Sequence, residues 1–156
     1  MAFIAPCVFI PKSVTDETLA VAPTPGKRLL EPFKSASGSS AIYILEDCEI
    51  DNEFEVHRHE ADLWICLEGE VEFEVGGELV EPWAKKLPDG KEDTREIKAK
   101  PGSAQGTIKY TLHAGDVLLV PAGQPHTHRT KTHARLYVTK IPQKEISLAD
   151  VPGWKA

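Results

Sequence analysis

Cysteine is scarce in this sequence and shows no pairing pattern. The chain has three cysteines, Cys7, Cys48 and Cys66, and none of them belongs to a CxxC motif. An odd number without that spacing excludes a disulfide framework and a cysteine-type zinc knuckle. We therefore expect the protein to work in a reducing compartment, the cytoplasm.

Excess positive charge and long apolar runs are also missing. The chain has 18 lysines and arginines against 24 aspartates and glutamates, a formal net charge of -6. Its lysines alternate with acids, so no basic face results, which excludes an electrostatic nucleic-acid partner. The apolar N-terminus has no basic start and is interrupted at Pro6 and Pro11. We therefore expect neither a secretory leader nor a membrane span.

What is present fits one globular domain. At 156 residues, with 41% hydrophobic and 27% charged residues, the chain is long enough to bury an apolar core without disulfides. We predict a single domain over residues 1–156 with an N-terminal arm over about residues 1–40. Within the arm, residues 1–6 are expected to form an edge strand or extended arm, and residues 13–21 one short helical turn that Pro23 stops.

Short segments of alternating apolar and polar residues dominate the rest of the chain. Val71 and Phe73 alternate with Glu70, Glu72 and Glu74, a period of two that buries one face of a strand and leaves the glutamates solvated. Glycines and prolines separate such segments, and helical periodicity is scarce. The pattern predicts an all-β antiparallel sandwich or barrel. Strands are expected at residues 41–45, 54–59, 63–67, 71–75, 108–112, 116–121 and 135–141.

One long segment, residues 81–107, breaks this pattern. It carries several prolines and glycines among alternating lysines and acids, and it shows no sustained periodicity. A long irregular segment inside a compact domain is usually functional or mobile. We interpret it as a mobile or edge-covering loop, with an active-site lid as the alternative.

Three histidines are spaced as metal ligands are. His57 and His59 lie two residues apart, so on an extended strand both rings would project from one face, roughly 6.6 Å apart. His126 follows the apolar run Val117–Val120 and a Pro-x-Gly turn, which would deliver it on a returning strand. Because neutral imidazole is the commonest protein ligand of metals, the arrangement predicts a metal site.

The segment before His126 resembles the second motif of the cupin superfamily, whose members are small barrels of two antiparallel β-sheets. That motif reads Gly, five residues, Pro, one residue, Gly, two residues, His, three residues, Asn. Gly115, Pro121, Gly123 and His126 match it, and Thr130 stands where asparagine is usual. The resemblance implies a cupin-type jelly roll with little helix.

The first cupin motif fits the sequence in two ways. It normally reads His-x-His, three or four residues, Glu, six residues, Gly. His57 and His59 supply the paired histidines, and Asp62 and Gly69 follow, but only two residues separate His59 from Asp62. In the second register Glu55 and His57 form the pair, and four residues lead to Asp62. The sequence does not choose between the two registers.

The second register is also similar to a narrower group, the sugar-anomerase-like cupins that include the β subunit of the evolved β-galactosidase and a sialic-acid anomerase. Their signature has the form Glu-x-His-Arg, three residues, Asp-Ile/Leu, and a later Leu-x-Gly-Glu. Residues 55–63 of this chain read Glu-Val-His-Arg-His-Glu-Ala-Asp-Leu, and residues 67–70 read Leu-Glu-Gly-Glu. The resemblance implies action on a sugar or a similar small polar molecule.

The predicted site is catalytic rather than a structural cage. Its predicted ligands are His57, His59, Asp62 and His126, a mixed nitrogen and oxygen set with positions left open for a small-molecule substrate or ligand. Such a set suits a divalent transition metal: Zn, Fe, Ni, Mn or Cu.

Glu55 and His128 are the predicted acid and base groups, because each lies two residues from a predicted ligand and shares its strand face. The alternative for His128 is a rim histidine without a catalytic role. Trp64 and Cys66 share one parity and are expected to pack in the core, with stacking of Trp64 on a sugar ring as the alternative. Arg58 points to the opposite face and is expected to pair with a glutamate.

We therefore expect a metal-dependent cupin that acts on a small polar molecule, with sugar anomerisation or isomerisation as the leading reaction. A non-haem iron dioxygenase that uses the three histidines is the first alternative. A non-catalytic cupin with a ligand-binding or structural role is the second, so the sequence leaves open whether the protein is an enzyme. A homodimer is a further expectation from the resemblance, because cupins often pair through edge strands and N-terminal arms.

Overall fold

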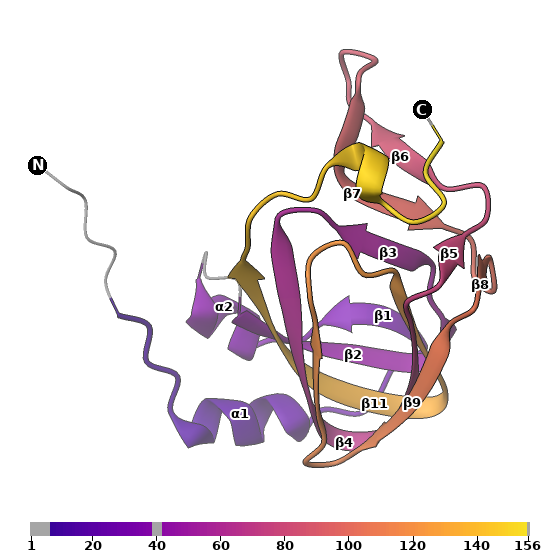
Figure 1. The fold of residues 1–156 in the computed structure, drawn as a ribbon. Helices are drawn as coiled ribbons and strands as arrows, with labels where there is room; N and C mark the ends of the chain where they lie inside the picture. The colour runs from indigo at the N-terminus through magenta and orange to yellow at the C-terminus, as the bar shows by residue number, and fades with distance from the viewer. Residues whose placement is uncertain (1–6, 39–41, 156) are drawn as a thin grey trace, which may run out of the picture.

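Antiparallel strands dominate the computed structural model, which describes residues 7–38 and 42–155 (Figure 1). A sheet of nine strands curls into a barrel, and two short strands form a separate pair. The strands are β1 Gly26–Leu29, β2 Ile42–Asp51, β3 Phe54–His57, β4 Glu60–Val75, β5 Glu78–Leu79, β6 Trp83–Lys86, β7 Glu92–Ala99, β8 Ala104–Gln105, β9 Ile108–His113, β10 Val117–Val120 and β11 His126–Pro142. The predicted all-β antiparallel fold is confirmed.

The two longest strands, β4 and β11, hold the barrel together. β11 pairs with β4 and also with β2 and β3, while β4 pairs further with β9 and β10. The path β1-β2-β11-β3-β7-β6 completes the large sheet. The register between β11 and β4 shifts between Arg129 and Ala134, and such irregularities allow long strands to bend around a core.

The alternation in β4 places Val71 and Phe73 inside the barrel, and neither has any exposed surface. Glu70 on the opposite face is exposed, as expected. The expectation of a solvated Glu74 is wrong, because its side chain is buried where Arg129 binds the carboxylate. A charged residue on the outward-facing side of a strand can thus be buried when a neighbouring strand supplies its counter-ion.

Helices α1 and α2 pack on the outside of the barrel. Helix α1, Lys12–Leu19, confirms the short helix expected near residues 13–21. In helix α2, Phe33–Ser37, the ring of Phe33 meets Tyr137 edge on, with centroids 6.0 Å apart. Arg135, 1% exposed, donates to two backbone oxygens beyond and at the end of α1. Two of the predictions concern residues outside the described ranges: the extended arm over residues 1–6, and Ala41 as the first residue of a strand.

Residues 81–107 form strands rather than the irregular loop that we expected. β6 and β7 make a hairpin, and β7 pairs with β3 so that Glu96 lies opposite His57. Ile97 and Ala99 in β7 are completely buried and anchor the hairpin. The prediction is wrong because charged residues surround these two apolar residues and obscure the period of two. The hairpin does extend over the edge of β3.

The cysteines and the helices complete the description. Cys7 is exposed, Cys48 and Cys66 are buried, and all three are free thiols. The last helical element is the 3-10 turn η1, Leu148–Asp150. Within residues 7–38 and 42–155, no helix combines the length and the apolar character that crossing a membrane requires.

Candidate metal centre

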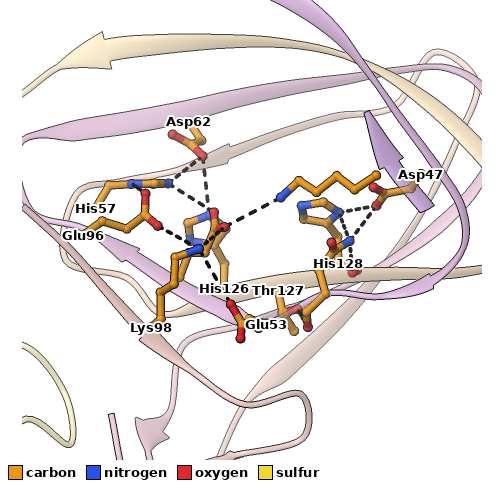
Figure 2. A network of polar contacts seen from close by, with 12 residues as sticks. Asp47, Glu53, His57, Asp62, Glu96, Lys98, His126, Thr127 and His128 are labelled. Atoms are coloured by element: carbon orange, nitrogen blue, oxygen red, sulfur yellow. Dashed lines mark hydrogen bonds and ion pairs between the residues drawn. The ribbon is translucent and has the colours of Figure 1, made fainter. Parts of the chain in front are cut away.

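Strands β3, β4 and β11 bring His57, Asp62 and His126 together inside the barrel (Figure 2). His57 ends β3, Asp62 lies near the start of β4, and His126 begins β11. Asp62 Oδ2 lies 3.3 Å from His57 Nε2 and 3.4 Å from His126 Nε2. The exposed fractions of the residues are 7%, 1% and 2%. The fold therefore assembles these predicted ligands in a buried cluster.

A tight turn before β11 positions His126. Gly123 in this turn has a φ of 83°, a backbone conformation that glycine adopts without strain. Its N–H donates to the carbonyl oxygen of His57 at 2.9 Å, which ties the turn to the end of β3. His126 then lies opposite Glu55 in the ladder between β11 and β3. The Pro-x-Gly motif thus places the third imidazole beside the first.

His126 has one ring nitrogen satisfied and one left open. Its Nδ1 lies 3.1 Å from the carbonyl oxygen of Gln124. Because a carbonyl only accepts, Nδ1 carries a proton, and Nε2 is the ring nitrogen that faces Asp62. Nε2 is buried and has no hydrogen-bond partner among the described residues. Since a buried polar atom without a partner is costly, this nitrogen, in the deprotonated form that a metal ligand requires, is suited to a metal ion.

His59 does not join the cluster. β3 ends at His57, and Arg58 and His59 lie in a bend before β4, so the assumed strand parity does not extend to His59. The side chain of His59 is 42% exposed, and its Nε2 lies 3.8 Å from Glu145 Oε1. The predicted grouping of His59 with His57 on one strand face is therefore wrong.

Glu55 completes the cluster instead. Glu55, His57 and His126 offer ligand atoms that lie within 4.8 Å of one another, and Glu55 Oε2 is 3.6 Å from His57 Nε2. Lys98 and Lys27 flank the Glu55 carboxylate at 3.3 and 3.7 Å. Of the two registers that the first motif allows, the geometry favours the one that pairs Glu55 with His57.

Lys140 is the member of the cluster that sequence analysis missed. It lies on β11 directly opposite Asp62 on β4. Its Nζ is 2.7 and 2.8 Å from the two Asp62 oxygens and 2.9 Å from His57 Nε2. Lys140 belongs to neither motif. The one sequence signal for its place in the cluster was its even spacing from His126, which on a regular strand puts both side chains on the same face.

Charges within the cluster shift the pKa values of its members. Burial raises the pKa of Asp62, but contacts with His126 and His57 outweigh burial and hold it well below its usual range. The pKa of Glu55 is likewise lowered against burial, first by His57 and then by nearby lysines. Both groups are therefore carboxylates at neutral pH.

The same neighbouring carboxylates raise the pKa of His57. Burial lowers it, but hydrogen bonds to Asp62 and Glu55 prevail and raise it to about 9, against the opposing charge of Lys140. Lys140 Nζ lies 2.9 Å from His57 Nε2. In the absence of a metal, this pair supplies the positive charge beside Asp62.

A cleft of about 330 Å³ reaches the cluster at His57. Strand β7 forms one of its walls, so the hairpin that replaces the expected loop shapes the entrance. Arg95 in this wall pairs with Asp93 at 2.6 Å. His59 also faces the cleft, although it lies outside the cluster. The complete lining is His57, His59, Glu60, Asp93, Arg95 and Glu96.

His128, the second predicted acid or base group, lies in the core rather than at the rim. It is 2% exposed, and its Nδ1 lies 2.5 Å from Asp47 Oδ2 (Figure 2). Asn52 donates to the same aspartate oxygen at 2.9 Å. The rings of Trp64 and Phe73 lie 4.9 and 5.2 Å from the imidazole, centroid to centroid. The rim interpretation of His128 is therefore wrong.

Three further residues have the surroundings that the sequence analysis predicted. Trp64 and Cys66 are buried in the main core cluster, which favours packing over stacking on a ligand. Arg58 donates to Glu145 Oε1 at 2.5 Å, which gives it the predicted pairing with a glutamate. It also donates to the carbonyl oxygens of Thr94 and Ile146, and so fastens β7 and the C-terminal segment to the bend after β3.

The donor set fits a divalent transition metal. Imidazole nitrogens with carboxylate oxygens suit several such metals, and their chemistry alone does not select one. The open Nε2 of His126 points to a ligand that is not part of the protein. The described residues thus include a cluster that could bind a metal.

Comparisons with known proteins bear on the fold. No family model and no curated protein matches the sequence. Among solved structures, BH2720 from Bacillus halodurans is similar over 90% of this chain and 86% of its own, with 16% identity and a TM-score of 0.50. YcfD, a ribosomal oxygenase from Escherichia coli, is 19% identical with a TM-score of 0.42, over 68% of this chain and 24% of that one. An oxalate oxidase is 14% identical with a TM-score of 0.45, over 87% and 59%.

These likenesses concern architecture alone. The chain spans about a quarter of the length of YcfD, and the identities are too low to transfer an activity or a ligand. The likeness to BH2720 covers most of both chains. The cupin-type fold that the two motifs predicted is confirmed.

Proposed function

We propose that this protein binds one divalent transition metal through His57, Asp62 and His126 and uses it on a small polar molecule. The observation that carries the proposal is the buried Nε2 of His126, which has no hydrogen-bond partner among the described residues and lies 3.4 Å from Asp62 Oδ2. Two imidazoles and one carboxylate leave coordination positions open, as catalytic metal sites do.

Anomerisation or isomerisation of a sugar-like molecule is the leading reaction within this proposal. The similarity of residues 55–63 to the sugar-anomerase-like cupins supports it. The cleft of about 330 Å³ also supports it, because that volume suits a small ligand. A bound metal would act as a Lewis acid on a carbonyl or hydroxyl oxygen.

Glu55 is the group that we assign to removal of the hydroxyl proton. Its lowered pKa keeps it a carboxylate, and Lys98 and Lys27 hold it beside the cluster. We assign proton donation to the ring oxygen to His59, which faces the cleft, rather than to the buried His128. An imidazole serves either direction of transfer because its pKa is ordinarily near neutrality.

Metal content is the first test. Protein purified without chelator is expected to contain about one metal ion per chain by elemental analysis, as for a single coordinated site. The His57→Ala, His126→Ala double variant should retain none. His113→Ala, which removes a 63% exposed histidine, is the matched control. Stoichiometric metal in the double variant would refute the assigned site.

The second test concerns the reaction. Exchange between the α and β forms of reducing sugars is measured by one-dimensional NMR over a panel of hexoses, uronic acids and sialic acid. Glu55→Gln should slow exchange by about 10²-fold with metal content unchanged. The control Glu53→Gln removes a 46% exposed carboxylate that lies 3.8 Å from the same Lys98, and it should have little effect.

A non-haem iron dioxygenase is the second candidate, because two histidines and one carboxylate with open positions are the donor set of such enzymes. Oxygen consumption with small aromatic or thiol substrates, without acceleration of sugar exchange, would favour it. If metal-loaded protein shows neither sugar exchange nor oxygen consumption, a ligand-binding role without catalysis is favoured.

We also propose that the protein is a cytoplasmic homodimer. The free thiols of Cys7, Cys48 and Cys66 support a reducing compartment. Val117 and Leu119 on β10 are 60% and 53% exposed, and an apolar strand of this kind is suited to pairing with a second copy. Analytical ultracentrifugation should find a dimer that Leu119→Lys converts to a monomer.

A further inference from the structure

Lys140 occupies a position that a metal would need. It enters the cluster from β11, directly across the ladder from Asp62. Its side chain is 17% exposed, whereas that of Asp62 has no exposed surface. The lysine stem therefore reaches inward, and its Nζ contacts a carboxylate that has little access to water.

Three short contacts hold Nζ there: the two Asp62 oxygens at 2.7 and 2.8 Å and His57 Nε2 at 2.9 Å. An ammonium has three N–H donors, and the two Asp62 oxygens accept from it. The three contacts involve two of the three ligands of the proposed metal. A metal ion and the ammonium cannot both lie beside Asp62 and His57 at these distances, because both are cations and both need the lone pairs of Asp62.

We propose that Lys140 is an internal cation that competes with the metal for Asp62 and His57 and is displaced toward the cleft when the metal binds. The inference rests on the proposed metal site. It adds that the cluster has two states, one neutralised by Lys140 and one by the metal. His126 Nε2, which Lys140 does not contact among the described interactions, is the acceptor left open for an incoming ion.

Lys98 provides a comparison beside the same cluster. Its side chain is 24% exposed, close to the 17% of Lys140. Its Nζ contacts Glu96 and Glu55 at 3.0 and 3.3 Å rather than Asp62 or His57. Removing Lys98 thus removes a nearby positive charge without freeing Asp62 or His57, which separates direct competition from general repulsion.

The test is calorimetric titration of Zn²⁺ and of Mn²⁺ into metal-free wild type, Lys140→Met and Lys98→Met at one pH. Lys140→Met should bind at least 100-fold more tightly than wild type, and Lys98→Met less than tenfold more tightly. Metal binding by wild type with no gain in Lys140→Met, or an equal gain in both variants, would overturn the competition while leaving the metal site intact. Absence of binding in all three proteins would instead refute the proposed function.

A second measurement uses the wild type, in case Lys140→Met does not fold. Amine acetylation at fixed pH, read by peptide mass spectrometry, reports how free each lysine is. Saturating Zn²⁺ should increase labelling of Lys140 several-fold. Lys12 and Lys91, whose side chains are 85% and 82% exposed, should be unaffected and serve as internal controls. Unchanged or reduced labelling of Lys140 at metal saturation would show that the metal does not displace it.

Discussion

His126 and His128 lie two residues apart on β11, each is 2% exposed, and each has an aspartate nearby. Their surroundings differ. His128 is bound to Asp47 and packed between aromatic rings, whereas His126 keeps an open Nε2 in a cluster at the end of a cleft. The comparison teaches that residue type, parity and burial do not define a ligand site. What distinguishes His126 is a buried ring nitrogen that has no hydrogen-bond partner among the described residues and lies 3.4 Å from Asp62 Oδ2.

Metal binding should separate the two histidines most strongly. His126→Ala removes the open acceptor and should weaken metal binding at least about 10³-fold, roughly 4 kcal/mol. His128→Phe should stay within about tenfold of wild type, because it keeps the aromatic packing and touches no proposed ligand. Calorimetric titration measures both. Equal losses of metal affinity in both variants would mean that the pair of His128 and Asp47 belongs to the metal site.

Folding stability should show the opposite order. Asp47→Ala leaves His128 buried without its 2.5 Å partner, and breaking a buried pair of this kind costs about 3 to 5 kcal/mol. His126→Ala removes a side chain with an unsatisfied atom and should cost metal-free protein about 1 to 2 kcal/mol. Urea unfolding of metal-free proteins gives both values. A larger loss in His126→Ala would reverse the roles inferred from the contacts.

The pH dependence should distinguish metal-free from metal-loaded protein. The pKa of His57 is raised from 6.5 to about 9 in the folded chain. Its contribution to the free energy of unfolding is therefore complete below about pH 6.5 and is lost as pH rises through 9. That loss is at most about 3 kcal/mol. Asp62 and Glu55 have lowered pKa values, so their contributions are lost on acidification instead.

Metal-loaded protein should behave differently over the same range. Histidine ligands must be deprotonated, so the metal should leave as pH falls toward and below about 6, and metal-loaded protein should gain stability with rising pH. Thermal unfolding between pH 5 and about 9.5, with and without Zn²⁺, compares the two forms. Parallel profiles would contradict the assignment of His57 to the site.

The smallest expected effect concerns the wall of the cleft. Ile97 in β7 is completely buried and paired with Val56 and Ala84, so its amide should exchange at least about tenfold more slowly than that of Gly90 in the hairpin tip. Hydrogen exchange read by NMR resolves both amides. Rapid exchange throughout residues 92–99 would restore the mobile loop that the sequence alone suggested.

Much of the fold and part of the candidate site could be predicted from the sequence. The period of two in β4 and the Gly/Pro turns were sufficient for an antiparallel barrel, because strand formation follows local alternation. The turn before His126 could also be predicted, because this turn requires a positive φ at position 123 and glycine adopts one without strain. The β6–β7 hairpin was missed because only Ile97 and Ala99 mark its buried face among charges.

The sequence by itself determined the fold class, the turn that delivers His126 and the presence of histidines spaced as ligands, because each depends on neighbours along the chain. Tertiary structure decided that a bend turns His59 away, that His128 is locked to Asp47, and that Lys140 reaches Asp62. These outcomes depend on the register between strands far apart in sequence, and a shift of one residue sends a side chain to the opposite face. The identity of the cation beside Asp62 is therefore a property of the barrel rather than of either motif.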